Sequence, residues 1–181
     1  MGILSRLIGA KKDKDSEGAS GLVSLVVLLP VPLRLNVAAL RQHLDSVFPG
    51  HFIPQTDDSF VMEWSNPAML FVKSIVPSHS GVFLVSFVPG PYTKFSDFAD
   101  HVSAPRLLDL VHRHNAWLSV DLISEVEPED DPYRFIGKTL AQLAPESSLA
   151  IVYPAKYIMV PFAESSRIHL RADDVLQSLG M

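Results

Sequence analysis

One stretch decides the fold of this chain, PRLLDLVHRHNAWLSVDLIS, which covers residues 105–124. The spacing of its apolar residues predicts a helix over Arg106–His114, and the apolar run that follows predicts a strand over Ala116–Ile123. At the joint, residues 112–115 read His-Arg-His-Asn, the densest polar cluster beside the expected core. The stretch therefore predicts a helix that feeds directly into a strand, with polar side chains at the corner.

The composition of the 181-residue chain is that of a globular protein. Hydrophobic residues make up 48% and charged residues 19%, which favours a packed core over disorder. The formal net charge is −5, so an acidic body repels phosphate backbones, and nucleic acid is not an expected partner. There is no cysteine, which excludes disulfides, thiolate metal sites and cysteine catalysis. The sequence predicts no metal site and no cofactor.

The first twenty residues differ from the rest and predict a separate tail. Ile3, Leu4, Leu7 and Ile8 form one helical stripe, and the charged, small residues of Lys11–Ser20 have the composition of a linker. Such a stripe is typical of a short amphipathic anchor for a protein partner or an anionic membrane. The alternative is a frayed tail, because isolated helices this short are marginal in water. We expect a tail over 1–20 and one domain over 21–181.

No segment predicts export or a membrane span. Ile3–Ala10 is too short and polar for the core of a signal peptide. The apolar run Leu22–Leu29 has eight residues, too few to cross a bilayer as a helix. A cytoplasmic protein is therefore the expectation.

The order of predicted elements indicates an α+β domain. The predicted strands are Leu22–Leu29, Ser59–Trp64, Ala68–Ile75, Val82–Val88, Ala116–Ile123, Ser148–Tyr153 and a short Tyr157–Val160. The predicted helices follow Asn36, surround Phe98, cover Arg106–His114, begin at Asp131-Pro132, and cover Ala172–Leu179 up to Gly180. Three adjacent strands imply antiparallel pairing, whereas the later alternation of helix and strand allows a parallel pair. We expect a mixed, largely antiparallel sheet with helices mainly on one face, similar to an α/β-plait.

The histidines of the corner have two interpretations. Donor side chains such as His112 and His114 near a helix C-terminus satisfy its free carbonyls, and Asn115 is a suitable residue to end the helix. Alternatively, one of the two histidines leans toward the core and performs acid–base chemistry, joined by His101 and Asp109. A metal pair is not indicated, because the two histidines are two residues apart and point in different directions on a helix.

Two further patterns resemble binding motifs. Gly137-Lys138-Thr139 has the letters that end a phosphate loop, but Pro132 stands where the first glycine belongs, and the triplet falls inside a predicted helix. The acidic run Glu125–Asp131 contains no glycine for an ordered cation loop, so we expect a solvated loop whose last aspartates cap the next helix.

Two proline-containing loops carry aromatic side chains. Tyr92 follows Pro89-Gly90-Pro91, and Tyr153 and Tyr157 flank Pro154-Ala155-Lys156. Rigid loops that carry tyrosines suit protein contact, although prolines after strands also simply end them. Tyr92, Tyr153 and Tyr157 are therefore candidate partner-binding residues, together with the stripe of the tail.

The segments Leu110–Ile123 and Leu149–Tyr157 resemble a bacterial domain family of unknown function. Members of that family have a helix that ends in His-x-Ala-His before an apolar strand, and a later strand that closes on a Tyr-Pro-like turn. In this chain His114-Asn115-Ala116-Trp117 stands at the histidine motif, with Trp117 in place of the second histidine. The resemblance implies an α+β domain without established chemistry, and the missing histidine argues against a metal.

These observations lead to one preferred function and two alternatives. The preferred function is a non-enzymatic protein-interaction module, since no complete catalytic set is present and the loops and tail suit contact. The first alternative is an enzyme or ligand-binding protein that uses His101, His112 or His114 with Asp109. The second is an immunity or antitoxin-like protein, whose acidity would suit a basic toxin. The oligomeric state is not predicted.

Overall fold

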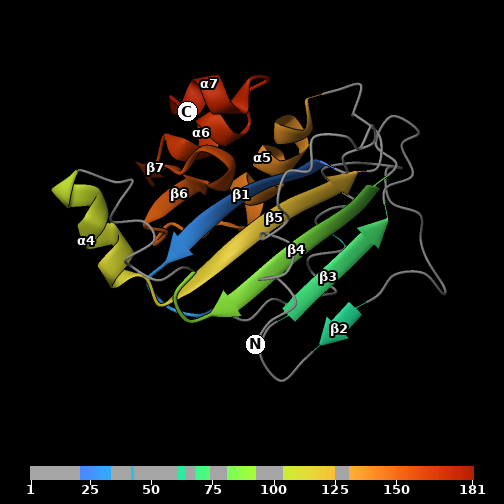
Figure 1. Ribbon diagram of the computed structural model, residues 1–181, viewed down its shortest axis with the longest axis horizontal. Helices are drawn as coiled ribbons and strands as arrows, with labels where there is room; N and C mark the ends of the chain where they lie inside the picture. Colours follow the sequence, from blue (N-terminus) through green and yellow to red (C-terminus); the bar gives the residue numbers. More distant parts are fainter. Residues whose placement is uncertain are drawn as a thin grey trace, which may run out of the picture.

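The computed structural model describes residues 21–33, 42, 61–63, 68–73, 81–92, 104–124 and 131–181 (Figure 1). The predicted tail, the predicted helix around Phe98 and the acidic run before Asp131 lie outside these residues, as does most of the helix predicted after Asn36, of which Gln42 alone is described and is helical. The candidate residues Ile3, Leu4, Leu7, Ile8 and His101 likewise lie outside the described part.

The described strands form one seven-stranded sheet in which every neighbouring pair is antiparallel. The strands are β1 (Gly21–Leu29), β2 (Val61–Glu63), β3 (Ala68–Lys73), β4 (Gly81–Pro89), β5 (Ala116–Ser124), β6 (Ala150–Tyr153) and β7 (Ile158–Pro161). Their order across the sheet is β2-β3-β4-β5-β1-β6-β7. The first strand of the chain is thus central, because β5 and β6 pair with its two edges.

The four strands β4-β5-β1-β6 have the interleaved order of an α/β-plait. β5 and β6 run in the same direction on either side of β1, and helix α5 (Pro132–Leu143) connects them. β1 and β4 run in the same direction on either side of β5. Two such split units define the plait, and β2, β3 and β7 widen it. The predicted α+β class is confirmed, but parallel strands are not neighbours anywhere in the described sheet.

One face of the sheet packs against three helices and forms the larger core. Figure 1 shows α5, α6 (Ser166–Leu170) and α7 (Val175–Leu179) grouped on the same side. The alternate residues Leu25, Val27 and Leu29 of β1 point to this side, where they pack with Ile136 and Leu140 of α5. The Asp131 carboxylate caps α5 by accepting a hydrogen bond from the Tyr133 N–H, as the sequence predicts.

The opposite face carries a smaller core under a single described helix. Helix α4 (Pro105–Arg113) lies apart from the other three and contacts β7 (Figure 1). The buried residues of this second core come from α4, β1, β5, β6, β7 and the residue before β6; they are Val26, Leu28, Val111, Trp117, Leu149, Ala150, Val152 and Met159. The residues of β1 therefore alternate between two cores, which is why this strand is apolar on both faces.

Gly137 explains why a phosphate-loop-like triplet occurs inside α5. A Cβ added at this position would lie 2.4 Å from the Leu170 carbonyl oxygen and 2.9 Å from a methyl group of Val175. Glycine is thus required where α5 meets α6 and α7 closely. The sequence did not predict α6, and α7 begins at Val175, three residues later than predicted, where Asp174 caps it. Gly180 ends α7 with a left-handed backbone, as predicted.

We predict that Gly137→Ala lowers the free energy of unfolding by about 1–3 kcal/mol, the usual cost of overpacking a core. At an exposed helical position the same change raises stability by about 1 kcal/mol. A loss of stability at residue 137 would therefore indicate the close contact of α5 with α6 and α7. Urea unfolding measures the difference, and Gln142→Ala, at an exposed position of the same helix, is the control that stays within about 0.5 kcal/mol of wild type. A stabilised Gly137→Ala variant would contradict the packing described.

Candidate functional site

The corner between α4 and β5 is held by His114. The first residue after α4, it is buried and has an extended backbone. Its Nδ1 atom donates a hydrogen bond to the Val111 carbonyl oxygen, and its Nε2 atom accepts one from the Tyr92 N–H at 2.9 Å. This arrangement requires the neutral ring with its proton on Nδ1. Burial lowers the pKa of His114, against the smaller opposing effect of the bond to Val111. The interpretation of this histidine as a partner of free helix carbonyls is therefore confirmed.

The other candidate acid–base residues lie on the exposed surface of α4. His112 is exposed, and the Asp109 carboxylate forms an exposed ion pair with Arg113, with 3.5 Å between nitrogen and oxygen. Both ring nitrogens of His114 are bonded to backbone atoms, so neither is bonded to Asp109 or His112. The structure thus places one candidate in the interior and two on the surface. A catalytic role for these residues stays a prediction.

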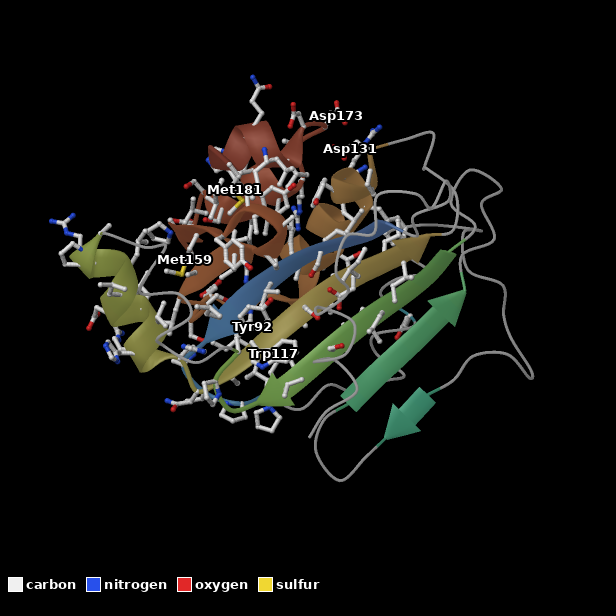
Figure 2. The ribbon with its side chains drawn as sticks, viewed as in Figure 1. Tyr92, Trp117, Asp131, Met159, Asp173 and Met181 are labelled. Carbon is white, nitrogen blue, oxygen red and sulfur yellow. The ribbon has the colours of Figure 1, made fainter. Side chains whose placement is uncertain are left out.

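The three candidate tyrosines have different environments. Tyr153 is buried in the larger core, edge-on to Tyr133 with 5.4 Å between ring centroids. Tyr92 is half-buried and lies edge-on to Trp117, with 5.2 Å between centroids (Figure 2). Tyr157 is exposed by 52%. Of the three, Tyr157 is the one that offers most of its ring to solvent.

A polar patch that the sequence analysis did not single out lies on the second face of the sheet. It consists of Ser24 from β1, Ser86 from β4, and Ser119 and Asp121 from β5. Ser24 is directly opposite Asp121 in the pairing of β1 with β5, and Ser86 is directly opposite Ser119 in the pairing of β4 with β5. Residues 24, 86, 119 and 121 thus form one continuous polar patch across three neighbouring strands.

Asp121 is the centre of this patch. Its side chain accepts hydrogen bonds from the hydroxyls of Ser24 at 2.5 Å and Ser119 at 2.7 Å. Asp121 is only 8% exposed, and burial raises the pKa of its carboxyl group, although the two hydroxyl donors act in the opposite direction. Ser86 is 1% exposed, and within the described structure its hydroxyl has no hydrogen-bond partner. The patch thus combines a buried carboxyl group with an unsatisfied hydroxyl.

Tyr92 is electrostatically linked to the patch. Burial, followed by the negative charge of Asp121 and a smaller effect of Tyr157, raises the pKa of the Tyr92 phenol to about 12. The backbone of Tyr92 is bonded to His114 and its ring packs on Trp117. Tyr92 therefore links two places on one face of the sheet, the polar patch and the corner between α4 and β5 where His114 lies.

Similarity to known proteins adds nothing to this geometry, since no protein-family model, no curated protein and no solved structure matches the chain. The resemblance to a bacterial domain family stays a prediction. Across the described residues, no group of three or more histidine, aspartate or glutamate side chains is placed to hold a metal ion. None of the helices in the same part of the chain has the length and apolar character needed to cross a membrane.

We predict that the free energy of unfolding of Asp121→Asn, relative to that of wild type, increases as the pH rises. The raised pKa means that the folded state binds a proton more tightly than the unfolded state, so wild-type stability is lost from about pH 3.9 upward, until the folded-state pKa is passed. The amide cannot ionise, and it can still bond both serines. Urea unfolding at pH 4.5 and 7.5 tests the difference, with Asp109→Asn on the exposed side of α4 as the matched control. The prediction would be contradicted if the difference in free energy of unfolding between the variant and wild type were the same at both pH values.

We predict that His114→Phe lowers the free energy of unfolding at pH 7.5 by about 1–3 kcal/mol, because the Tyr92 N–H loses its acceptor. The lowered pKa of His114 makes the charged ring unfavourable in the folded state, so its contribution to stability is lost as the pH falls below about 6.5. The variant loses that part of the pH dependence. Chemical denaturation at pH 7.5 and 5.5 measures both effects, and His112→Phe is the exposed control. An unchanged difference between the two pH values would disprove the assignment of the neutral ring.

Proposed function

We propose that this chain is a non-enzymatic protein-interaction module whose contact point is the corner at Tyr157. The observation that supports the proposal most is the backbone of this residue. Its φ of 55° and ψ of 34° place it in the left-handed region, and among the described residues it is the only one other than glycine with a positive φ. A bulky aromatic residue in that conformation costs about 1–2 kcal/mol, and such strain gathers at functional sites.

The surroundings hold Tyr157 in place at the edge of the sheet. It follows the short helix η2 (Pro154–Lys156) and precedes β7, and its N–H donates a hydrogen bond to the Pro154 carbonyl oxygen. Ala155 and Lys156 beside it are exposed, and the ammonium group of Lys156 lies 5.9 Å from the centre of the Tyr153 ring. Tyrosine is, with tryptophan and arginine, one of the residue types enriched among those that dominate the binding energy of interfaces.

The charge of the chain favours a basic partner. The net charge of −5 would attract such a partner over a distance and speed its encounter with the anchor. An immunity or antitoxin-like role is a special case of this proposal, in which the captured partner is a toxin. The membrane or partner anchor proposed for residues 1–20 is a second contact that can be tested separately.

We predict that Tyr157→Asn abolishes partner capture without destabilising the fold. Asparagine tolerates the left-handed conformation, so the loss of the ring is offset by relief of strain, and the free energy of unfolding stays within about 1 kcal/mol of wild type. The measurement is affinity purification of the tagged full-length protein from its own host, read by mass spectrometry, with urea unfolding of both proteins alongside.

Ile168→Asn is the matched control, because Ile168 is a well-exposed apolar residue on α6 and the change is of the same kind. Partners that are lost with Tyr157→Asn but kept with Ile168→Asn would support the proposal. Partners lost only when residues 1–20 are removed would assign the contact to the tail instead. The proposal fails if wild type captures no specific partner, or if the Tyr157 variant captures the same partners in the same amounts.

A further inference from the structure

We propose that the polar patch of Ser24, Ser86, Ser119 and Asp121 binds the primary ammonium group of a small organic amine. The four side chains come from three adjacent strands and project from the same face of the sheet. They supply one carboxyl group and three hydroxyl oxygens, a set of acceptors that suits a cation carrying several N–H donors. This proposal does not depend on the contact proposed for Tyr157.

The hydrogen bonds of the patch are incomplete without a ligand. A carboxylate has about four lone-pair positions, and Asp121 uses one for Ser24 and one for Ser119. Ser86, which is buried beside Ser119, has no partner for its hydroxyl in the described structure. Because a buried polar group without a partner costs about 1–3 kcal/mol, the patch is built at an energetic cost. An ammonium group has three donors, which match the free positions of Asp121 and the lone pairs of Ser86 and Ser119.

The charge of the patch is also incomplete. In the part of the chain that the structure describes, Asp121 forms no ion pair with a lysine, arginine or histidine. A buried carboxylate without a counter-ion is strongly disfavoured. A bound ammonium group supplies the missing positive charge in a position of low dielectric constant, where the attraction is stronger than at the surface.

The buried patch borders the exposed end of the second face of β1. Along the residues of β1 that point to this face, exposure falls from 49% at Leu22, through the partly exposed Ser24, to 1% at Val26. Leu22 is opposite the partly buried Ile123, one step outward from the pair of Ser24 and Asp121. An apolar rim therefore borders the polar patch on its exposed side. This combination favours an amine with a short alkyl chain, whose apolar body covers Leu22 and Ile123.

A metal ion fits these residues less well than an amine. A divalent cation such as calcium takes six to eight oxygen ligands, usually with several carboxylates, whereas the patch contains one. The serine hydroxyls lie 2.5 and 2.7 Å from the carboxylate oxygens, which is the spacing of direct hydrogen bonds. The carboxylate and hydroxyls thus form a layer of acceptors rather than an open shell around an ion.

The test is isothermal titration of the full-length protein with n-butylammonium chloride, with sodium chloride at the same ionic strength as the blank. We expect saturable binding by wild type, at least about tenfold weaker binding by Asp121→Asn, and unchanged affinity in Asp109→Asn, since losing one partner of a close charge pair commonly has an effect of this size. Tetramethylammonium, which has no N–H donor, is expected to bind at least about tenfold more weakly.

Ser86→Ala separates a ligand site from a merely structural patch. Removing an unpartnered hydroxyl is expected to leave urea unfolding unchanged or improved, yet it takes an acceptor from the ligand and weakens n-butylammonium binding several-fold. The proposal is overturned if wild type shows no saturable binding of n-butylammonium, or if Asp121→Asn and Ser86→Ala both bind it as tightly as wild type. Tighter binding of Nα-acetyl-lysine methylamide than of n-butylammonium would also overturn it, because the site would then belong to a lysine of another protein.

Discussion

The pairing of β1 on both of its edges is the constraint on which the rest of the structure depends. β5 and β6 take up its backbone hydrogen bonds on either side, and its side chains alternate between the two cores. The end of the strand also fixes both flanking connections, since the carbonyl oxygens of Leu28 and Leu29 accept the N–H groups of Leu149 and Asn115. Once β1 is paired in the correct register, the face of the sheet to which each side chain of its neighbouring strands points is also fixed. A slip of one residue would exchange the two faces.

The position of the polar patch is a consequence of the same register. The second core fills the face of β1 at Val26 and Leu28, where α4 and Trp117 contribute to it. Beyond Val26 the next residue on this face is Ser24, and the register places Asp121 opposite it. A polar cluster therefore begins where the apolar cover of the second core ends. His114 lies at the other end of the same face, where Tyr92 contacts both His114 and Trp117. The negative charge of Asp121 acts on the phenol of Tyr92.

Sequence patterns predicted the elements whose signal is local. β1, β4, β5 and α4 begin and end within about one residue of their predicted limits, because each has a long apolar run or a clear helical period with a proline or polar residue at its end. The capping roles of Asp131 and Gly180 could also be predicted from the sequence, since they depend on residue type and position alone. Helix α6 was missed because five residues carry too little periodicity to be recognised.

The polar patch could not be predicted because its meaning depends on pairing. In β5 the polar residues Ser119 and Asp121 alternate with the apolar Leu118, Val120 and Leu122, and this alternation was the signal that part of the strand has a polar side. That signal does not distinguish a solvent-facing side from a buried one. Only the register between strands that are almost a hundred residues apart brings Ser24 to Asp121. The fold therefore creates, from scattered and individually ordinary serines, a buried acidic site that no short motif contains.

Two features of this chain carry an energetic cost. Tyr157 holds an unfavourable backbone conformation at the surface, and Asp121 keeps a carboxyl group in a place that disfavours its charge. Asparagine would remove the cost at both positions, since it tolerates the left-handed backbone of residue 157 and, being nearly the same size as aspartate, replaces the carboxyl group of residue 121 with a group that cannot ionise. Since natural sequences tolerate such conflicts chiefly at functional positions, these two residues are where the function of the chain is to be sought. At the corner that the sequence made most conspicuous, both ring nitrogens of His114 are bonded to backbone atoms, and the Asp109 carboxylate is paired with Arg113 at the surface.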